Sequence, residues 1–491
     1  MTKNPNKTKR TFFLDQHGCA KNQVDGELLI GHLEDEGWTL CDDPSISDLI
    51  IINSCGFIES AKKESLESLI SARESYPEAK IILAGCLAER YAEDFALDLK
   101  EADGIFGNGD LIEIKNIVKE LFPKEAQNEE EFGALVIRPL QEGVCTGSRT
   151  KLLNFPGSAY VKITEGCNNC CTFCAIPLIR GQLRSRPIED IFKEVSDFIE
   201  NGVFEINLIG QDLASYGRGE PDKSVFINTE TGASNASPLF HLLSKLSTLT
   251  GNFWIRLLYI HPDNFPLDIL SVIKKDSRIL PYFDIPFQSG DEKIIAAMNR
   301  HNSPSFYRSL VQTIRDECKE SSYADCTIRT TFLCGFPGET DEAAANTEKF
   351  LESIKPDWSG CFVYSKEEDT KAFSLKPQVP KKTAHKRMNS LIDLQQGITK
   401  EALVRHTGKV FQVLVEELIE DSTGNEGLAI GRAWFQAPEV DGACVIRYEL
   451  DDENAVKAVQ SGQVVSVKVI GSTDVDIDSV FISGAASSIT M

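Results

Sequence analysis

Three short apolar runs, separated by helical patterns, organise the first 145 residues of the chain. They lie at 11–14, 48–53 and 80–84 and are continuous and rich in β-branched residues. Runs of this kind are typical of strands that are buried on both faces of a parallel sheet. Because strands and helices alternate, we expect residues 1–145 to form an open parallel α/β sheet with right-handed crossovers.

The alternation of strands and helices continues between residues 151 and 400. Six strand–helix units fall short of the eight of a closed barrel, so we expect a partial (βα)6 TIM-like barrel with its chemistry at the strand carboxyl ends. The stretch 120–150 reads as a linker, and the Gly-, Ser- and Asn-rich stretch 218–237 as an inserted loop. The candidate strands are 159–164, 204–209, 253–260, 282–287, 327–336 and 360–364.

In residues 405–491 the pattern changes to short strands separated by turn residues. Five such strands predict a small closed β-barrel of the oligonucleotide-binding kind. Its charge argues against that ligand, because from Gly408 onward there are five Lys and Arg against fourteen Asp and Glu, a net charge of −9. The candidate strands are 410–415, 429–434, 444–447, 464–470 and 480–482.

Composition limits the partners and the compartment. The 491 residues are enough for about three domains. A net charge of −23 disfavours nucleic acid as a partner unless a local basic patch overrides it. No apolar run reaches about 18 residues, so we expect no membrane span, and no signal peptide is evident. Fourteen cysteines without an export signal predict reduced thiols in the cytoplasm, some of them on metal.

The most specific chemistry comes from four cysteines within eight positions. Three of them, Cys167, Cys171 and Cys174, have the spacing CxxxCxxC. Three thiolates at this spacing can hold a cuboidal iron–sulfur cluster whose fourth iron stays open for a reactant. Zinc is the alternative that the spacing leaves open, although no second CxxC or His pair follows nearby. We expect the fourth cysteine, Cys170, to bind no iron.

A second set of cysteines follows the three N-terminal strands, one after each: Cys19, Cys55 and Cys86. The carboxyl ends of parallel strands share one edge of a sheet, so three cysteines far apart in sequence should converge there. A glycine beside each lets the backbone approach a bulky ligand. Any one of them alone would read as a buried core cysteine. Three at equivalent positions predict the ligands of a second cluster, again with one open iron.

These motifs resemble those of the radical S-adenosylmethionine methylthiotransferases. Phe173, an aromatic residue before the last cysteine of the CxxxCxxC motif, is part of the resemblance to the superfamily signature. The sequence departs from the usual family motif at two places, without loss of a cysteine. Gln16-His17 stands where Ser-Leu is usual, and Gly26-Glu27 stands where Ser-Glu is usual. The stretches that resemble this branch are 18–25, 53–58 and 84–87 around the N-terminal cysteines, and 160–167 and 176–181 around the central motif.

The resemblance implies a methylthiotransferase N-terminal domain at 1–145, a radical S-adenosylmethionine domain at 151–400 and a substrate-binding TRAM domain at 405–491. It implies two 4Fe-4S clusters, one on each set of cysteines, and S-adenosylmethionine as methyl donor and radical source. The central cluster would generate a radical that takes hydrogen from the substrate, and the N-terminal cluster would deliver the methylated sulfur. A reductant such as flavodoxin or ferredoxin would supply the electrons.

Polar residues at strand ends are the candidates for the cofactor site and the substrate clamp. We expect Phe173, Gln288 and Arg329 to bind the cofactor, and no catalytic residue beyond the cluster ligands. For each of these strand-end positions, an ordinary polar residue that lines the barrel or lies on the surface is an equally good interpretation. The other candidates are Gln211, Asp212, Arg256, Thr330 and Thr331.

Within this family the substrate is either an adenosine of tRNA or one aspartate of ribosomal protein S-twelve. The acidic barrel favours the protein, so we expect methylthiolation of the aspartate β-carbon by a monomer. The nearer alternative is a tRNA adenosine methylthiotransferase. The more distant alternative is a non-catalytic iron–sulfur carrier or scaffold, which would need neither open iron. Stretches that resemble the RimO type of the family are 255–262, 328–332, 360–365, 378–380 and 437–442.

Overall fold

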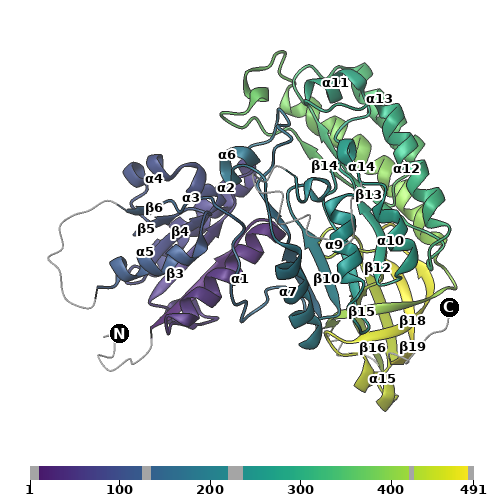
Figure 1. Cartoon of the computed structure of the whole chain (residues 1–491), viewed down its shortest axis with the longest axis horizontal. Helices are drawn as coiled ribbons and strands as arrows, with labels where there is room; N and C mark the ends of the chain where they lie inside the picture. Colours follow the sequence, from purple (N-terminus) through teal and green to yellow (C-terminus); the bar gives the residue numbers. More distant parts are fainter. Residues whose placement is uncertain (1–9, 124–133, 219–235, 420–424, 485–491) are drawn as a thin grey trace.

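Two parallel sheets and a closed barrel make up the computed structural model of the chain (Figure 1). The structure describes residues 10–123, 134–218, 236–419 and 425–484. Nearly all of the stretch 218–237, expected as an inserted loop, lies outside these residues. Among the helices that are described, none is long and apolar enough to cross a membrane.

The first sheet has six parallel strands in the order β2-β1-β3-β4-β5-β6. The three predicted strands form its centre, and all of β3 is buried, which is why a continuous apolar run encodes it. One prediction was wrong, because β6 lies inside the expected linker and pairs with β5. The strands are β1 (Thr11–Gln16), β2 (Thr39–Leu40), β3 (Leu49–Ser54), β4 (Lys80–Gly85), β5 (Gly104–Phe106) and β6 (Leu135–Ile137).

Helix α1 (Ala20–Asp35) joins this sheet to the second one. It packs on β1 and also on β7 of the second sheet, and it is buried over most of its length. In Figure 1 it lies between the two sheets. The other helices of this part are α2 (Glu59–Ser75), α3 (Cys86–Arg90), α4 (Ala92–Asp98) and α5 (Ile114–Leu121), with short 3-10 turns η1 (Pro44–Ile46) and η2 (Leu111–Glu113).

The second sheet confirms the expected six-stranded open parallel arrangement, in the order β14-β13-β12-β11-β10-β7. Its strands are β7 (Ser158–Lys162), β10 (Glu205–Ile209), β11 (Trp254–Leu257), β12 (Ile279–Asp284), β13 (Thr327–Cys334) and β14 (Trp358–Val363). The larger helices around it are α7 (Ile188–Glu200), α9 (Pro238–Leu246), α10 (Ile269–Lys275), α11 (Glu292–Ala297), α12 (Pro304–Cys318), α13 (Asp341–Ile354) and α14 (Lys381–Val404). Smaller elements are β8 (Thr164–Glu165) paired with β9 (Arg184–Ser185), α6 (Ile176–Arg180), η3 (Leu213–Ser215), η4 (Pro262–Asn264) and η5 (Lys371–Ser374).

The five C-terminal strands close into the predicted barrel. Its neighbours pair antiparallel except β17 with β19, which are parallel. The barrel contacts the amino ends of the second sheet: the indole N–H of Trp358, the first residue of β14, donates to the Phe435 carbonyl at 2.9 Å. The elements are β15 (Val410–Ile419), β16 (Glu426–Arg432), β17 (Cys444–Glu449), α15 (Glu453–Ala458), β18 (Val464–Ser472) and β19 (Ile477–Gly484).

Candidate functional site

The three N-terminal cysteines lie together at the carboxyl edge of the first sheet. Cys19 caps α1 after β1, Cys55 follows β3 and Cys86 begins α3 directly after β4. Two glycines allow the turns to approach. A Cβ on Gly18, whose φ is +91°, would lie 3.1 Å from the Cys55 Cβ, and one on Gly56 would lie 2.6 Å from the Cys86 carbonyl oxygen. Side chains at these two positions would therefore push the cysteines apart.

A buried network of four charges adjoins this N-terminal triad. Arg180 on α6 donates from Nη2 to the Cys86 Sγ at 3.1 Å and pairs with Asp25 of α1 at 2.8 Å and Glu165 at 3.0 Å. Lys162 pairs with both carboxylates at 2.5 Å. Burial disfavours the Glu165 carboxylate, but Arg180 and Lys162 outweigh burial and hold the pKa of Glu165 well below its usual range. Arg180, which follows the central cysteines, thus helps to fix the position of Cys86 in the N-terminal triad.

The thiols of this triad affect one another electrostatically. Burial raises the pKa of Cys55 to about 12, and the neighbouring Cys86 adds to the shift. Burial opposes ionisation of Cys19 as well, but Lys21 and Arg180 lower its pKa. Clustered thiolates need a cation to take up their charge, and metal ions supply it. The chemistry of this donor set therefore fits a metal-containing group.

The central cysteines share one tight loop between β8 and α6. The Cys167 N–H donates to the Gly181 carbonyl at 3.2 Å, and the Cys174 N–H donates to the Cys171 carbonyl at 3.1 Å. Burial raises the pKa of Cys167 to about 11, and it also raises the pKa of Cys174, with Cys171 and Cys167 adding to that shift. Cys170 differs from these three because it is exposed and has a φ of +53°. That it binds no iron stays a prediction.

All fourteen cysteines are free thiols. In the described ranges, no three His, Cys, Asp or Glu side chains surround one point closely enough for a single metal ion. A cuboidal cluster needs wider spacing, because each thiolate binds a different iron. Each triad supplies three thiolates, one short of the four protein ligands of a structural zinc site.

The two triads lie next to each other across the contact between α3 and α6. Cys86 packs against Ala175 and Ile179, and Ala175 directly follows Cys174. A second contact secures the same junction: the buried Glu367 accepts from Lys62 at 2.8 Å and from Arg90 at 2.6 Å. The carboxyl edges of the two sheets thus face one another.

The three expected cofactor residues have different neighbours. Phe173 packs against the apolar cluster that contains Met298 and Phe336. Gln288 has a φ of +70° and donates its backbone N–H to Thr331 at 2.7 Å. Arg329 is paired with Asp284 at 3.1 Å and with Asp441, which lies between β16 and β17, at 3.3 Å. Their binding to the cofactor stays a prediction.

Two of the other candidates support the cysteine loop. Asp212 accepts from the Asn169 side chain at 2.8 Å and from the His261 N–H at 3.0 Å, which places the His261 ring 3.9 Å from the Cys171 sulfur. Gln211 donates to Glu165 at 2.7 Å. These residues therefore position the loop and the charge network.

The remaining candidates make contacts within the second sheet or with the barrel. The Thr330 hydroxyl is buried and accepts from the Phe287 N–H at 3.2 Å, while Thr331 supplies the carbonyl that bonds Gln288. The prediction of a clamp residue was wrong for Arg256. Its guanidinium is fully buried, pairs with Glu205 at 2.9 Å and donates to the Trp434 carbonyl at 2.7 Å, so it joins the sheet to the barrel.

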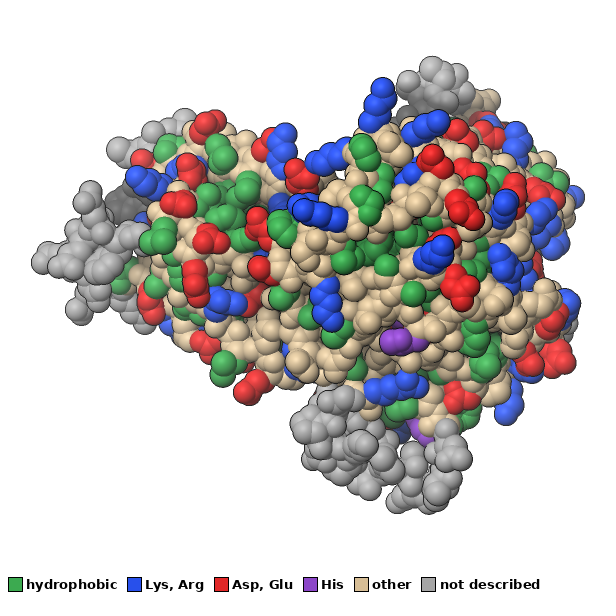
Figure 2. All heavy atoms as spheres, turned by 90° about the horizontal axis from the view of Figure 1, so that it is seen from above, with side chains coloured by type: hydrophobic (Ala, Val, Ile, Leu, Met, Phe, Trp, Pro, Cys, Tyr) green, Lys and Arg blue, Asp and Glu red, His purple; other side chains and the backbone are tan. Residues whose placement is uncertain are grey.

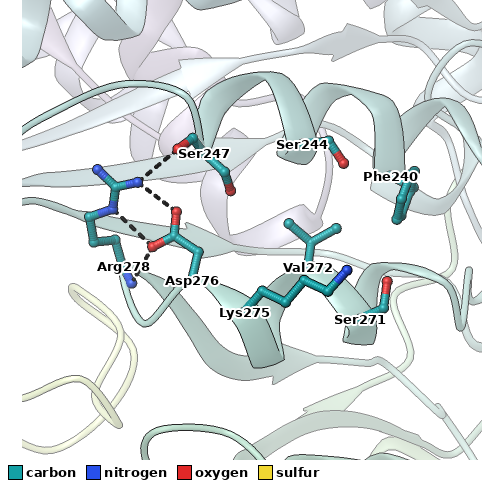
Figure 3. Close-up of a pocket in the computed structure, with 8 residues that line it drawn as sticks. All are labelled: Phe240, Ser244, Ser247, Ser271, Val272, Lys275, Asp276 and Arg278. Atoms are coloured by element: carbon teal, nitrogen blue, oxygen red, sulfur yellow. Dashed lines mark hydrogen bonds and ion pairs between the residues drawn. The ribbon is translucent and has the colours of Figure 1, made fainter. Parts of the chain in front are cut away.

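A cavity of about 420 Å³ between α9 and α10 lies in the outer helical layer (Figure 3). Arg278 and Asp276 at its end bind each other at 2.7 Å. Arg278 also donates to the Ser247 carbonyl at 2.9 Å. Its lining contains no cysteine and no residue expected at the site. The cavity therefore gives no argument for the chemistry.

Three segments of the chain match known families. Residues 11–107 match the family described as "Uncharacterized protein family UPF0004". Residues 161–351 match the "Radical SAM superfamily", and residues 407–482 match the "TRAM domain". The three matches fall on the first sheet, the second sheet and the barrel, respectively.

Proteins with the name "Ribosomal protein uS12 methylthiotransferase RimO" are similar to nearly the whole chain. The one from Treponema denticola is 51% identical over 472 residues, which are 95% of this chain and 100% of that protein. The one from Thermotoga maritima is 37% identical over 434 residues, 88% of this chain and 92% of that protein.

Among solved structures, the radical S-adenosylmethionine methyltransferase TsrM from Kitasatospora setae resembles the chain in fold. The TM-score is 0.50 at 14% identity, over 72% of this chain and 73% of that one. At this identity the likeness concerns the fold alone.

Proposed function

The chain belongs to the RimO family of radical S-adenosylmethionine methylthiotransferases, and from this premise we propose that it methylthiolates ribosomal protein uS12. The target is the β-carbon of an aspartate, with S-adenosylmethionine as methyl donor and radical source. The observation that carries the proposal is the juxtaposition of two three-cysteine sites across the contact of α3 with α6. A non-catalytic carrier would need neither this pairing nor open positions in both sites.

Cys19, Cys55 and Cys86 hold one 4Fe-4S cluster in this proposal, and Cys167, Cys171 and Cys174 hold the other. When bound, the clusters and S-adenosylmethionine supply the radical chemistry and the sulfur. Three protein ligands leave one iron of each cluster open to a reactant. Cys170 takes no part.

The residues of this chain bind, orient and exclude water. Arg180 donates to the Cys86 sulfur and so fixes the orientation of that ligand. The ion pairs of Lys162 and Arg180 with Asp25 and Glu165 hold the two cysteine-bearing edges together in a buried setting. Asp212 holds the central loop through Asn169. The four charged residues are buried, so water is excluded from this contact between the two edges.

The charge of the barrel supports a protein substrate over tRNA. Its net charge of −9 repels a polyanion and attracts a basic protein. On the face of the molecule in Figure 2, acidic and basic side chains are interspersed, so no broad basic surface favours RNA there. A ribosomal substrate also requires the enzyme in the cytoplasm.

We extend the proposal to the organisation of the enzyme. The domains span 1–145, 151–400 and 405–491, and the chain acts as a monomer. A small reductant such as flavodoxin or ferredoxin supplies the electrons, because reductive cleavage of S-adenosylmethionine consumes one.

The experiment that tests the substrate offers the enzyme two choices at once. The anaerobically reconstituted enzyme is incubated with reductant, methyl-labelled S-adenosylmethionine, and equal amounts of uS12 and tRNA. We expect label on uS12 with a mass gain of one methylthio group. Label on tRNA would overturn the substrate assignment, and a fully iron-loaded protein that labels neither would favour the carrier.

A further inference from the structure

Lys21 is a half-buried lysine that crosses from the first sheet to the second. It is the second residue of α1 and follows Cys19 by two positions. Its Nζ lies 3.2 Å from the centroid of the Tyr259 ring, and Tyr259 follows β11 at the carboxyl edge of the second sheet. The ammonium group therefore lies in the region where the two cysteine-bearing edges meet.

The other charged groups named in this region pair with groups of opposite charge, whereas no ion pair with a carboxylate is formed by Lys21 among the described residues. Lys162 and Arg180 share the carboxylates of Asp25 and Glu165, and Asp284 is paired with Arg329. Within the described part of the chain, no carboxylate lies within ion-pair distance of the Lys21 Nζ, and no acceptor forms a hydrogen bond with it. A sheltered ammonium that no carboxylate neutralises is unfavourable, so the position favours an incoming carboxylate.

Tyr259 is held in a conformation that presents its ring to Lys21. Its φ is +68°, a left-handed value that is rare for an aromatic residue. Two hydrogen bonds fix this backbone: its N–H donates to Asp284 at 3.2 Å, and its carbonyl accepts from Leu213 at 2.9 Å. Such strain persists where the surroundings impose it, and it concentrates at functional sites. The ring contributes a cation–π contact and leaves the ammonium donors open.

We propose that Lys21 binds the side-chain carboxylate of the target aspartate and so determines the preference for aspartate over asparagine. This inference rests on the proposed function. The aspartate carboxyl carbon is bonded directly to the reacting β-carbon, so an ion pair at Lys21 places that carbon between the two triads. A charge-assisted hydrogen bond also discriminates against the neutral amide, which offers it only a dipole.

The test measures binding rather than turnover. Reconstituted wild type, Lys21→Met, Lys21→Arg and the surface control Lys63→Met are titrated anaerobically with uS12 and with uS12 carrying asparagine at the target position. We expect wild type and Lys63→Met to bind the aspartate form roughly ten- to a hundredfold more tightly, the range of one charged hydrogen bond. Lys21→Met loses most of this difference, and Lys21→Arg retains part of it.

Two further readouts keep the result interpretable. Iron content equal to wild type shows that Lys21→Met folds and carries its clusters. If Lys21→Met still prefers the aspartate form over the asparagine form as strongly as wild type does, the inference is overturned. If that variant also loses S-adenosylmethionine binding, Lys21 is assigned to the carboxylate of the cofactor instead. If wild type modifies tRNA and leaves uS12 unmodified, the proposed function itself fails and the inference fails with it.

Discussion

Arg180 connects the two halves of the site more directly than any other side chain discussed above. It belongs to the helix that follows the central cysteine motif, yet it donates to a cysteine of the N-terminal triad at 3.1 Å. A cation that donates to a ligand sulfur stabilises the more negative, reduced state of a cluster. Arg180 should therefore raise the reduction potential of the N-terminal cluster.

Replacing Arg180 with Gln should lower the midpoint potential of that cluster, because the positive charge near the Cys86 sulfur is lost. A redox titration followed by electron paramagnetic resonance measures this. Arg308→Gln, at an exposed arginine on α12, is the matched control and should leave the potential unchanged. An unaltered potential in Arg180→Gln would mean that the contact is only structural.

Two cysteine substitutions distinguish the ligands from the bystander. After anaerobic reconstitution, wild type and Cys170→Ala should each hold about eight irons, and Cys86→Ala about four, because one 4Fe-4S cluster is lost. Iron and sulfide analysis gives the counts. Loss of iron from Cys170→Ala would make that residue a ligand, and about four irons in wild type would mean that the N-terminal cysteines are merely buried.

The grouping of the six cysteines into two sets could be predicted from the sequence, while most of their neighbours could not, and their binding of iron stays a prediction. CxxxCxxC is a local spacing, and the three N-terminal cysteines follow recognisable strands. The partners of Arg180, Lys21 and Arg256 lie far away along the chain, where no local pattern indicates them. Arg256 is an example. As a polar residue on a strand it was a candidate for the substrate clamp, but in the structure it pairs with Glu205 next to the barrel.

At the scale of elements, the barrel is joined to the second sheet by buried ion pairs. Glu205, the first residue of β10, accepts from Arg256 at 2.9 Å and from Arg432 of β16 at 2.6 Å. Burial disfavours the Glu205 carboxylate, but Arg432 and Arg256 outweigh it and lower the pKa of Glu205 below its ordinary value of 4.5. Its stabilisation is therefore complete above that pH and is lost as the pH falls through the lower, folded-state value.

Glu205→Ala should lower the free energy of unfolding by about 3–5 kcal/mol, because the buried Arg256 loses its carboxylate partner and the buried Arg432 keeps only Glu416. Urea denaturation near neutral pH, followed by tryptophan fluorescence, measures the change. Glu352→Ala removes an exposed carboxylate on α13 and should have little effect. Equal stability of the two variants would show that the interface does not depend on this network.

The elements themselves were largely predictable because each has a complete local pattern. The three central strands of the first sheet, the six strands of the second sheet and the five of the barrel all appear near their expected positions. The short strands β2, β5 and β6 have two or three residues each and leave too short a signal. β6 in particular is stabilised by pairing with β5, which a linker-like composition does not indicate.

At the scale of the molecule, the proposed function depends on two separate sheets that meet at their carboxyl edges. Glu367 bridges that junction through Lys62 and Arg90. Glu367→Ala should loosen it and reduce uS12 modification roughly 10- to 100-fold, because small misplacements of reacting groups have effects of that size. Hydrogen exchange should increase in α3 and in residues 365–369.

The control for this prediction is Glu352→Ala, which removes a carboxylate distant from the junction. Unchanged iron content in Glu367→Ala would show that the loss comes from docking rather than from cluster binding. Full activity with increased hydrogen exchange would contradict the view that the rigid contact positions the two sites.

The role of the N-terminal triad can be tested by the intact mass of uS12 after anaerobic incubation with S-adenosylmethionine, reductant and either wild type or Cys55→Ala. We predict a gain of one methylthio group with wild type and no sulfur insertion with Cys55→Ala, whose central cysteines are intact. Sulfur insertion by Cys55→Ala would contradict the claim that the N-terminal triad supplies the sulfur.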